Sequence, residues 1–174
     1  SGFLKPVETL KARDPKGFNV LFVDDDLTPF GVLEPFIIEL KKQNKFNVYL
    51  RCKNSTVENY PVTLIDRSKS FMDSLSQHEI DIVVGGISSC LIQAQACHCL
   101  PITVQNNCDY GRHLIEDGLS IPLNDVTQFT SFLNSLTIEQ ISELLVPIQG
   151  RHKTDQITSL QIVWQDVKKR VNKL

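Results

Sequence analysis

The sequence lacks the features that mark membrane-spanning and nucleic-acid-binding proteins. None of its apolar runs is long enough to cross a bilayer, and no signal peptide is recognisable at its start. The lysines and arginines are spread thinly instead of forming a basic stripe, and the formal net charge is only −2, so we expect no nucleic-acid partner. With 41% hydrophobic residues in 174, the chain has enough apolar material for one ordinary globular core.

Cysteine pairs of the kind that hold zinc are also missing. The five cysteines are scattered through apolar segments and include no CxxC pair, a pattern that favours reduced thiols. Cys97, His98 and Cys99, with Cys90 and Cys108 nearby, have the side-chain types of a soft-metal site. However, two cysteines two positions apart on a helix point in different directions. We therefore expect buried thiols, no metal site and a cytoplasmic location.

Hydrophobic periodicity predicts the architecture. β-rich apolar runs occur at residues 19–23, 46–51, 61–66, 80–86 and 100–105, with a weaker one at 119–123. Helical patterns lie between or after them, at 34–42, 68–77, 88–99, 125–135, 137–147 and 155–172. Strands that are apolar on both faces and alternate with helices are typical of a mostly parallel sheet. We predict one α/β domain over residues 1–174, a Rossmann-like, mostly parallel sheet with helices on both faces and a helical C-terminal tail.

Two of these helices carry more specific expectations. Pro35 is expected in the first turn of its helix, where proline is tolerated. The segment 88–99 is nearly all apolar, which predicts a buried helix.

Three adjacent aspartates, Asp24, Asp25 and Asp26, follow the first predicted strand. The acidic pair of a response-regulator receiver would require a lysine after the fifth strand, and none follows it. Asp24, Asp26 and Thr28 fit the DxDxT spacing of haloacid-dehalogenase-type enzymes, but no GD dipeptide supplies the rest of their magnesium site. The DxD motif of one glycosyltransferase fold follows a complete nucleotide-binding half, which is not its position here.

A solvated acidic turn, in which Asp or Thr side chains cap the following backbone, fits these residues best. A magnesium-dependent phosphotransferase that uses Asp24 and Asp26 stays open as a second alternative.

An ordered series of short motifs lies further along the chain. It consists of "QAQACHCLP" (93–101), "PITVQNN" (101–107), "HLIEDG" (113–118) and "LSIPLND" (119–125). The series resembles the carboxyl-terminal, nucleotide-sugar-binding domain of GT-B glycosyltransferases, in particular the large retaining group of family 4. The resemblance covers about residues 18–172 and implies a Rossmann-like fold with its ligand at the carboxyl ends of the strands.

The segment "GGISS" is the best seat for a diphosphate. Gly85 and Gly86 would let the backbone approach a ligand closely. Ser88 and Ser89 would open the next helix with N–H groups directed at the phosphates. A tight strand-to-helix turn capped by serine explains the same residues without a ligand.

The resemblance implies further contacts to the nucleotide-sugar. Gln93 would bind the ribose, and the base would lie beside the backbone from Ile65 to Arg67. Asn106 and Asn107, at another strand end, could hydrogen-bond the sugar or only satisfy the turn. The donor is a substrate, so no separate cofactor is implied, and the catalytic residues stay unknown.

The resemblance is incomplete where charge matters. The family usually has an arginine and a lysine after the first strand, where this chain has residues 24–28, and a glutamate where it has Gln93. Neutralisation of the diphosphate would then come from residues such as Arg67, Lys69 or Arg112, or catalysis has been lost.

We therefore expect the C-terminal half of a two-domain glycosyltransferase that acts in surface polysaccharide or glycoconjugate synthesis. The missing N-terminal domain would carry the acceptor, and the full-length enzyme would be able to associate peripherally with a membrane. The alternative is a catalytically inactive module of the same fold that serves binding or assembly.

Overall fold

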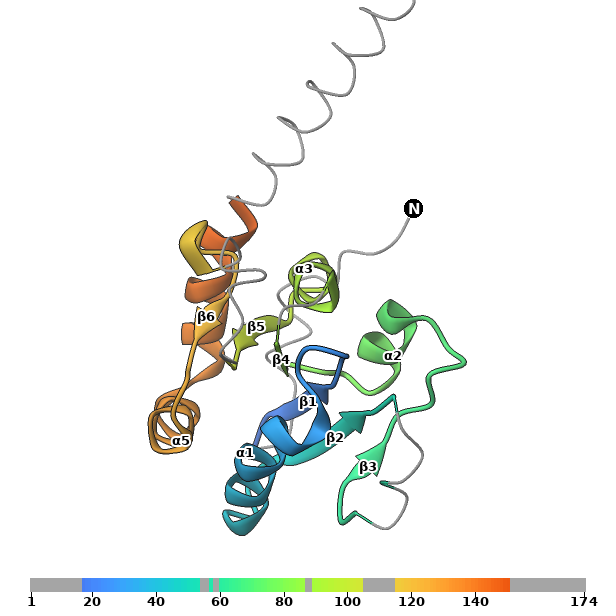
Figure 1. The fold of residues 1–174 in the computed structure, drawn as a ribbon. Helices are drawn as coiled ribbons and strands as arrows, with labels where there is room; N and C mark the ends of the chain where they lie inside the picture. Colours follow the sequence, from blue (N-terminus) through green and yellow to red (C-terminus); the bar gives the residue numbers. More distant parts are fainter. Residues whose placement is uncertain (1–16, 54–56, 58–59, 87–88, 105–114, 151–174) are drawn as a thin grey trace, which may run out of the picture.

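The computed structural model describes residues 17–53, 57, 60–86, 89–104 and 115–150. These residues form a six-stranded sheet in the order β3-β2-β1-β4-β5-β6, and every neighbouring pair of strands is parallel (Figure 1). The strands are β1 (Asn19–Val23), β2 (Asn47–Arg51), β3 (Thr63–Leu64), β4 (Ile82–Gly85), β5 (Leu100–Thr103) and β6 (Ile121–Pro122). The predicted Rossmann-like α/β fold is confirmed.

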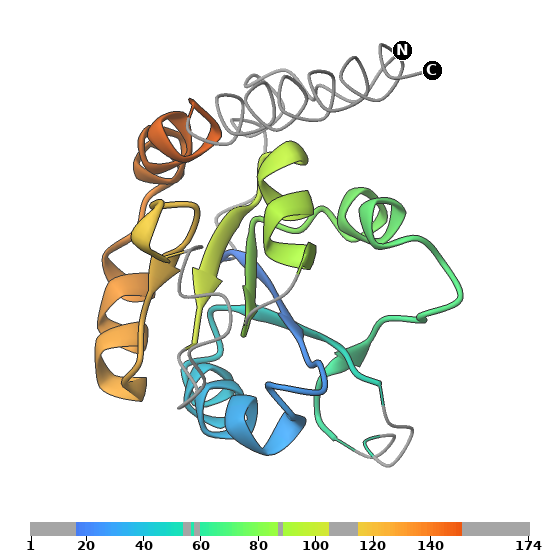
Figure 2. The same ribbon diagram turned by 45° about the horizontal axis from the view of Figure 1, so that its top comes forward.

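Helices cover both faces of the sheet, as predicted. They are α1 (Phe30–Lys42), α2 (Phe71–Gln77), α3 (Ser89–Ala96) and α5 (Val126–Ser135), and residues 138–150 are also helical. Helices α1 and α5 lie on one side of the sheet, and α2 and α3 lie on the other (Figure 2). The predicted helix at 155–172 lies outside the described residues.

The central strands divide their side chains between two cores. In β1, Val20 and Phe22 belong to the core beneath α1 and α5, whereas Leu21 and Val23 belong to the core beneath α2 and α3. This alternation follows from the pleat of a strand, whose successive side chains point to opposite faces. Because both faces are covered, all four residues are at most 2% exposed, and the strand reads as continuously apolar.

Helix α1 begins four residues earlier than the pattern predicted. Pro29 stands at its N-cap and Pro35 lies inside the helix, so the prediction that Pro35 belongs to the first turn is wrong. Proline lacks an N–H, and the carbonyl of Gly31 therefore receives no helical hydrogen bond from Pro35. The ring lies on the exposed side of the helix, where water can satisfy that carbonyl.

Helix α3 is shorter and less buried than its apolar composition predicted. It ends at Ala96, two residues before His98, which has a positive φ of 58°. Only one face of the helix is buried, including Gln95, while Gln93 is exposed. The expectation of a buried helix at 88–99 is thus wrong for its outer face.

The cysteines are less buried than expected. Cys99 is buried and its thiol donates to the carbonyl of Ile80 at 3.1 Å, whereas Cys52, Cys90 and Cys97 are only partly buried. All four are thiols; Cys108 lies outside the described residues. No group of three metal-ligating side chains occurs within the described part of the chain. The helices described there also include none with the length and apolar character needed to cross a membrane.

Candidate functional site

The carboxyl ends of all six strands meet at one edge of the sheet because the strands are parallel. We call this the carboxyl edge. From β1 the chain continues to β2 on one side, and from β4 it continues to β5 on the other side. The strand order therefore reverses between β1 and β4. Ligands of open α/β sheets bind at the carboxyl edge near such a reversal. The turn after β1 and the start of α3 both lie there.

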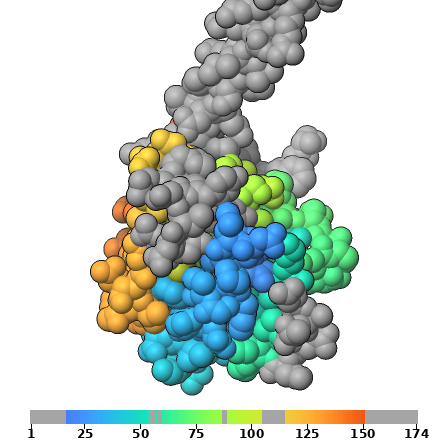
Figure 3. Space-filling model, viewed as in Figure 1, coloured from blue at the N-terminus to red at the C-terminus, as the bar shows by residue number. Residues whose placement is uncertain are grey.

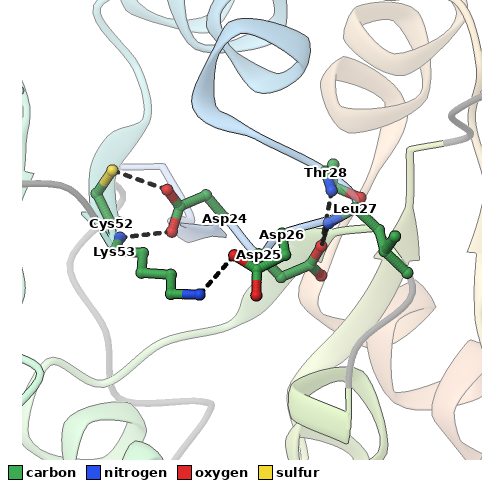
Figure 4. Close-up of polar contacts among 7 residues, drawn as sticks. All are labelled: Asp24, Asp25, Asp26, Leu27, Thr28, Cys52 and Lys53. Atoms are coloured by element: carbon green, nitrogen blue, oxygen red, sulfur yellow. Dashed lines mark hydrogen bonds and ion pairs between the residues drawn. The ribbon is translucent and has the colours of Figure 1, made fainter.

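Asp25 caps the turn after β1. Its Oδ1 atom accepts hydrogen bonds from the backbone N–H groups of Leu27 at 2.9 Å and Thr28 at 2.7 Å (Figure 4). The predicted capping of this turn by an aspartate is confirmed. The second oxygen, Oδ2, is buried and has no hydrogen-bond partner among the residues that the structure describes.

Asp24 is a buried anchor between two strands and is only 3% exposed. Its Oδ1 accepts from the backbone N–H of Lys53 at 2.7 Å, and its Oδ2 accepts from the thiol of Cys52 at 2.9 Å. Both partners follow β2, so this carboxylate ties the ends of β1 and β2 together (Figure 4). The expectation of a solvated turn is therefore wrong for Asp24, which is buried. Its partners are far away in sequence, so no local pattern predicts this burial.

Asp26 is exposed and forms an ion pair with Lys53, with 2.5 Å between Oδ1 and Nζ. The hydrogen bond and the charge of Lys53 hold the pKa of Asp26 below its ordinary value, and the charge of Arg67 adds a smaller effect. The three aspartates thus bind backbone N–H groups, a thiol and an ammonium group. They do not converge on a common point as the ligands of a magnesium ion would.

Gly85 and Gly86 make close contacts inside the protein. A Cβ atom placed on Gly86 would lie 1.5 Å from Thr28 Oγ1 and 2.5 Å from Thr28 Cβ, and one on Gly85 would lie 3.2 Å from the Val23 carbonyl. Thr28 is fully buried, so the turn after β1 packs directly on the end of β4. This contact gives a structural reason for Gly86 that needs no ligand.

The other predicted site residues within the described part of the chain lie at two places, after β3 and in the first turns of α3. Ile65 is buried just after β3, and its N–H donates to the Leu50 carbonyl at 2.8 Å, while Arg67 is exposed. Ser89 is the first residue of α3 and Gln93 lies one turn further on, both exposed. Ser88, Asn106, Asn107 and Arg112 lie outside the described residues.

Arg51, the last residue of β2, was not among the predicted site residues. It is 9% exposed, and its guanidinium donates to the Lys69 carbonyl at 2.9 Å and to Ser74 Oγ at 3.5 Å. The same group lies 5.4 Å from the centre of the Phe71 ring. Burial lowers its pKa from the ordinary arginine value. The sequence feature that points to Arg51 is a charged residue at the end of the apolar run "NVYLR".

Comparisons with known proteins identify a similar fold but show no closer relationship. No protein-family model and no curated protein sequence matches the chain. Among solved structures it is similar to the glycotransferase of kitacinnamycin, with a TM-score of 0.50 and 14% sequence identity. The match covers 85% of this chain but only 43% of that protein. At this identity the similarity concerns the fold alone.

Proposed function

We propose that this chain is the nucleotide-sugar-binding domain of a GT-B glycosyltransferase. The fold similarity to a glycosyltransferase supports this reading, because it extends over most of this chain and less than half of the other protein. A complete enzyme would then have a second Rossmann-like domain for the acceptor. The acceptor class we infer is a surface polysaccharide or glycoconjugate, with the full-length enzyme in the cytoplasm and in peripheral contact with a membrane.

One observation carries the proposal. The segment after β3, with Ile65 and Arg67, and the start of α3, with Ser89, lie at the same edge of one parallel sheet. Strands β3 and β4 are three positions apart in the sheet, or about 14 Å at the usual spacing of strands. An extended nucleoside diphosphate has a comparable length. Its base would lie beside Ile65 and its diphosphate would approach the N–H groups of the first turn of α3.

Gln93 would bind the ribose in this arrangement. It lies on the exposed face of α3, one turn after Ser89, and its amide can donate to or accept from a hydroxyl group. Gln95, two positions later, is fully buried and donates to the Leu119 carbonyl at 2.5 Å, so it is engaged within the fold.

A non-catalytic binding module is the second candidate. The observation in its favour is the turn after β1, which carries Asp24, Asp25 and Asp26 where the resembling family carries cations. Carboxylates near the leaving diphosphate would oppose the charge stabilisation on which sugar transfer depends. Such a module would still bind a nucleotide if its phosphates were neutralised from another side.

Chemical-shift perturbation by NMR tests the proposal, with UDP, GDP, CDP and ADP titrated separately. We expect at least one nucleotide to shift resonances in residues 65–67 and 85–93. Gln93→Ala should weaken binding several-fold, the effect of losing one hydrogen bond. Gln43→Ala is the matched control, because Gln43 ends α1 at the opposite edge of the sheet. If the folded chain responds to none of the four nucleotides at millimolar concentration, the proposal is wrong.

A further inference from the structure

Three cations gather at the carboxyl edge on the β2–β3 side. Arg51 and Lys53 stand at the end of β2, and Arg67 follows β3. The end of β2, in turquoise, adjoins the turn after β1, in blue, on the surface (Figure 3). Three acids of the edge thus lie on the turn after β1 and a fourth, Asp66, directly precedes Arg67, while the cations follow β2 and β3.

Within the part of the chain that the structure describes, no carboxylate contacts the buried charge of Arg51. The ion pairs found among the described residues join Lys42 to Glu39 and Lys53 to Asp26, and Arg51 belongs to neither. Within the described residues, its guanidinium contacts a carbonyl, a hydroxyl and an aromatic ring. A charge removed from water is costly unless a counter-charge compensates it. An anion at the carboxyl edge would supply that compensation.

The carboxylates around Arg51 are engaged by other donors. Asp66 accepts from both the N–H and the hydroxyl of Ser68, at 2.8 and 2.5 Å. Asp24 accepts from Cys52 and from the Lys53 backbone. Both carboxylates keep their negative charge, and that of Asp66 acts on Arg51 through space, but neither forms an ion pair with it among the described residues.

Arg67 adds a second positive charge close to the first. Its charge reaches Arg51, where it contributes to the lowered pKa, and it reaches Asp26. Arg67 and Lys53 are exposed and so are accessible to a ligand. Lys69 is exposed as well, and its ammonium donates to Gln77 Oε1 of α2 at 2.8 Å.

The strand order places these cations between the two ends of the proposed ligand site. Strand β2 lies between β3 and β1, and β1 adjoins β4. A ligand that extends from the segment after β3 to the start of α3 must therefore cross the ends of β2 and β1. With the base after β3, the diphosphate would lie over the ends of β2 and β1 and end at the start of α3. The long side chains of Lys53 and Arg67 would reach it there, with the charge of Arg51 beneath.

We propose that Arg67 and Lys53 bind the diphosphate of the nucleotide and that Arg51 supplies a buried positive charge behind them. This inference rests on the proposed function and deepens it. The cations that neutralise the phosphates come from the ends of β2 and β3, and the turn after β1, with its three aspartates, does not provide them. Asp26 competes with the ligand for Lys53 through the ion pair of 2.5 Å.

Binding constants from NMR titration test the inference on four variants of the full chain. Arg67→Gln and Lys53→Gln each remove an exposed charge and should weaken nucleoside diphosphate binding about tenfold, the effect of one charge-assisted hydrogen bond. Asp26→Asn should tighten binding, because it releases Lys53 and removes a repelling carboxylate. Lys45→Gln is the matched control, since Lys45 is exposed and precedes β2 at the opposite edge. Binding of the nucleoside without phosphates should be the same in all variants.

The outcomes separate this inference from the proposed function. If a nucleoside diphosphate binds the wild type but Arg67→Gln and Lys53→Gln behave like Lys45→Gln, the cations have no such role and the proposed function stands. If Asp26→Asn weakens binding, the assumed competition is wrong and the inference falls. If no nucleoside diphosphate binds the wild type, both are overturned.

Discussion

The three adjacent aspartates show how differently identical residues behave at one strand end. Asp24 is buried against the end of β2, Asp25 caps its own turn, and Asp26 reaches an exposed lysine. Their contributions to the free energy of unfolding should differ accordingly. Removing a buried acceptor leaves its donors unsatisfied, whereas an exposed ion pair is screened by water.

Replacement by alanine should therefore separate Asp24 from Asp26. Asp24→Ala leaves the Lys53 N–H without its acceptor and should lower the free energy of unfolding by about 2 kcal/mol. Asp26→Ala should cause no measurable change at neutral pH. Since the pKa of Asp26 is lowered, its small contribution is present above the unfolded-state pKa and is lost in acid as the pH falls through the folded-state value. Urea denaturation measures both variants, and equal losses would contradict this assignment.

At the scale of elements, the turn after β1 packs closely on the end of β4. Thr28 is fully buried against Gly86 and leaves no space for a Cβ atom. The contact joins the two strands between which the sheet order reverses. It places the turn after β1 against the end of β4.

Gly86→Ala should therefore destabilise the fold by about 2 kcal/mol or more, the effect of an overpacked core. In a Thr28→Gly background the same substitution should cost less, with a coupling energy of at least about 1 kcal/mol in a double-mutant cycle. Gly31→Ala is the matched control, because nothing lies within 4 Å of the added Cβ. It should leave stability unchanged or raise it slightly, since alanine favours helix. Additive effects of Thr28→Gly and Gly86→Ala would refute the contact.

At the scale of the whole molecule, the charges of the carboxyl edge distinguish two functions. A phosphotransferase of the DxDxT type needs carboxylates that converge on magnesium after β1. A nucleotide-binding domain needs cations and N–H groups along the path of a diphosphate. The aspartates after β1 are occupied by internal donors, and the cations stand on the neighbouring strands.

Calorimetry with magnesium chloride tests this distinction on the whole chain. We expect no magnesium site of millimolar affinity or tighter, because the ion requires several oxygen ligands in octahedral geometry. Asp26→Asn should give the same titration as the wild type. A site that is present in the wild type and lost in Asp26→Asn would revive the phosphotransferase.

The sequence alone determined the layers of this protein. Apolar runs at 19–23 and 80–86 indicated strands buried on both faces, and the helices between strands required a parallel sheet. These features are local in the chain or follow from chain direction, so periodicity records them. The same reasoning located the capped turn, because the N–H groups that Asp25 binds lie two and three residues away.

Only the tertiary structure decided which residues at the carboxyl edge meet. Asp24 and Cys52 are 28 positions apart, and Gly86 meets Thr28 because β4 lies beside β1. The buried charge of Arg51 likewise depends on the packing of α2 over the end of β2. No local pattern encodes such contacts, since they arise from the order of strands in the sheet. Because β2 lies beside β1, Asp24 binds groups at the end of β2, and the cations that follow β2 lie near the acidic turn.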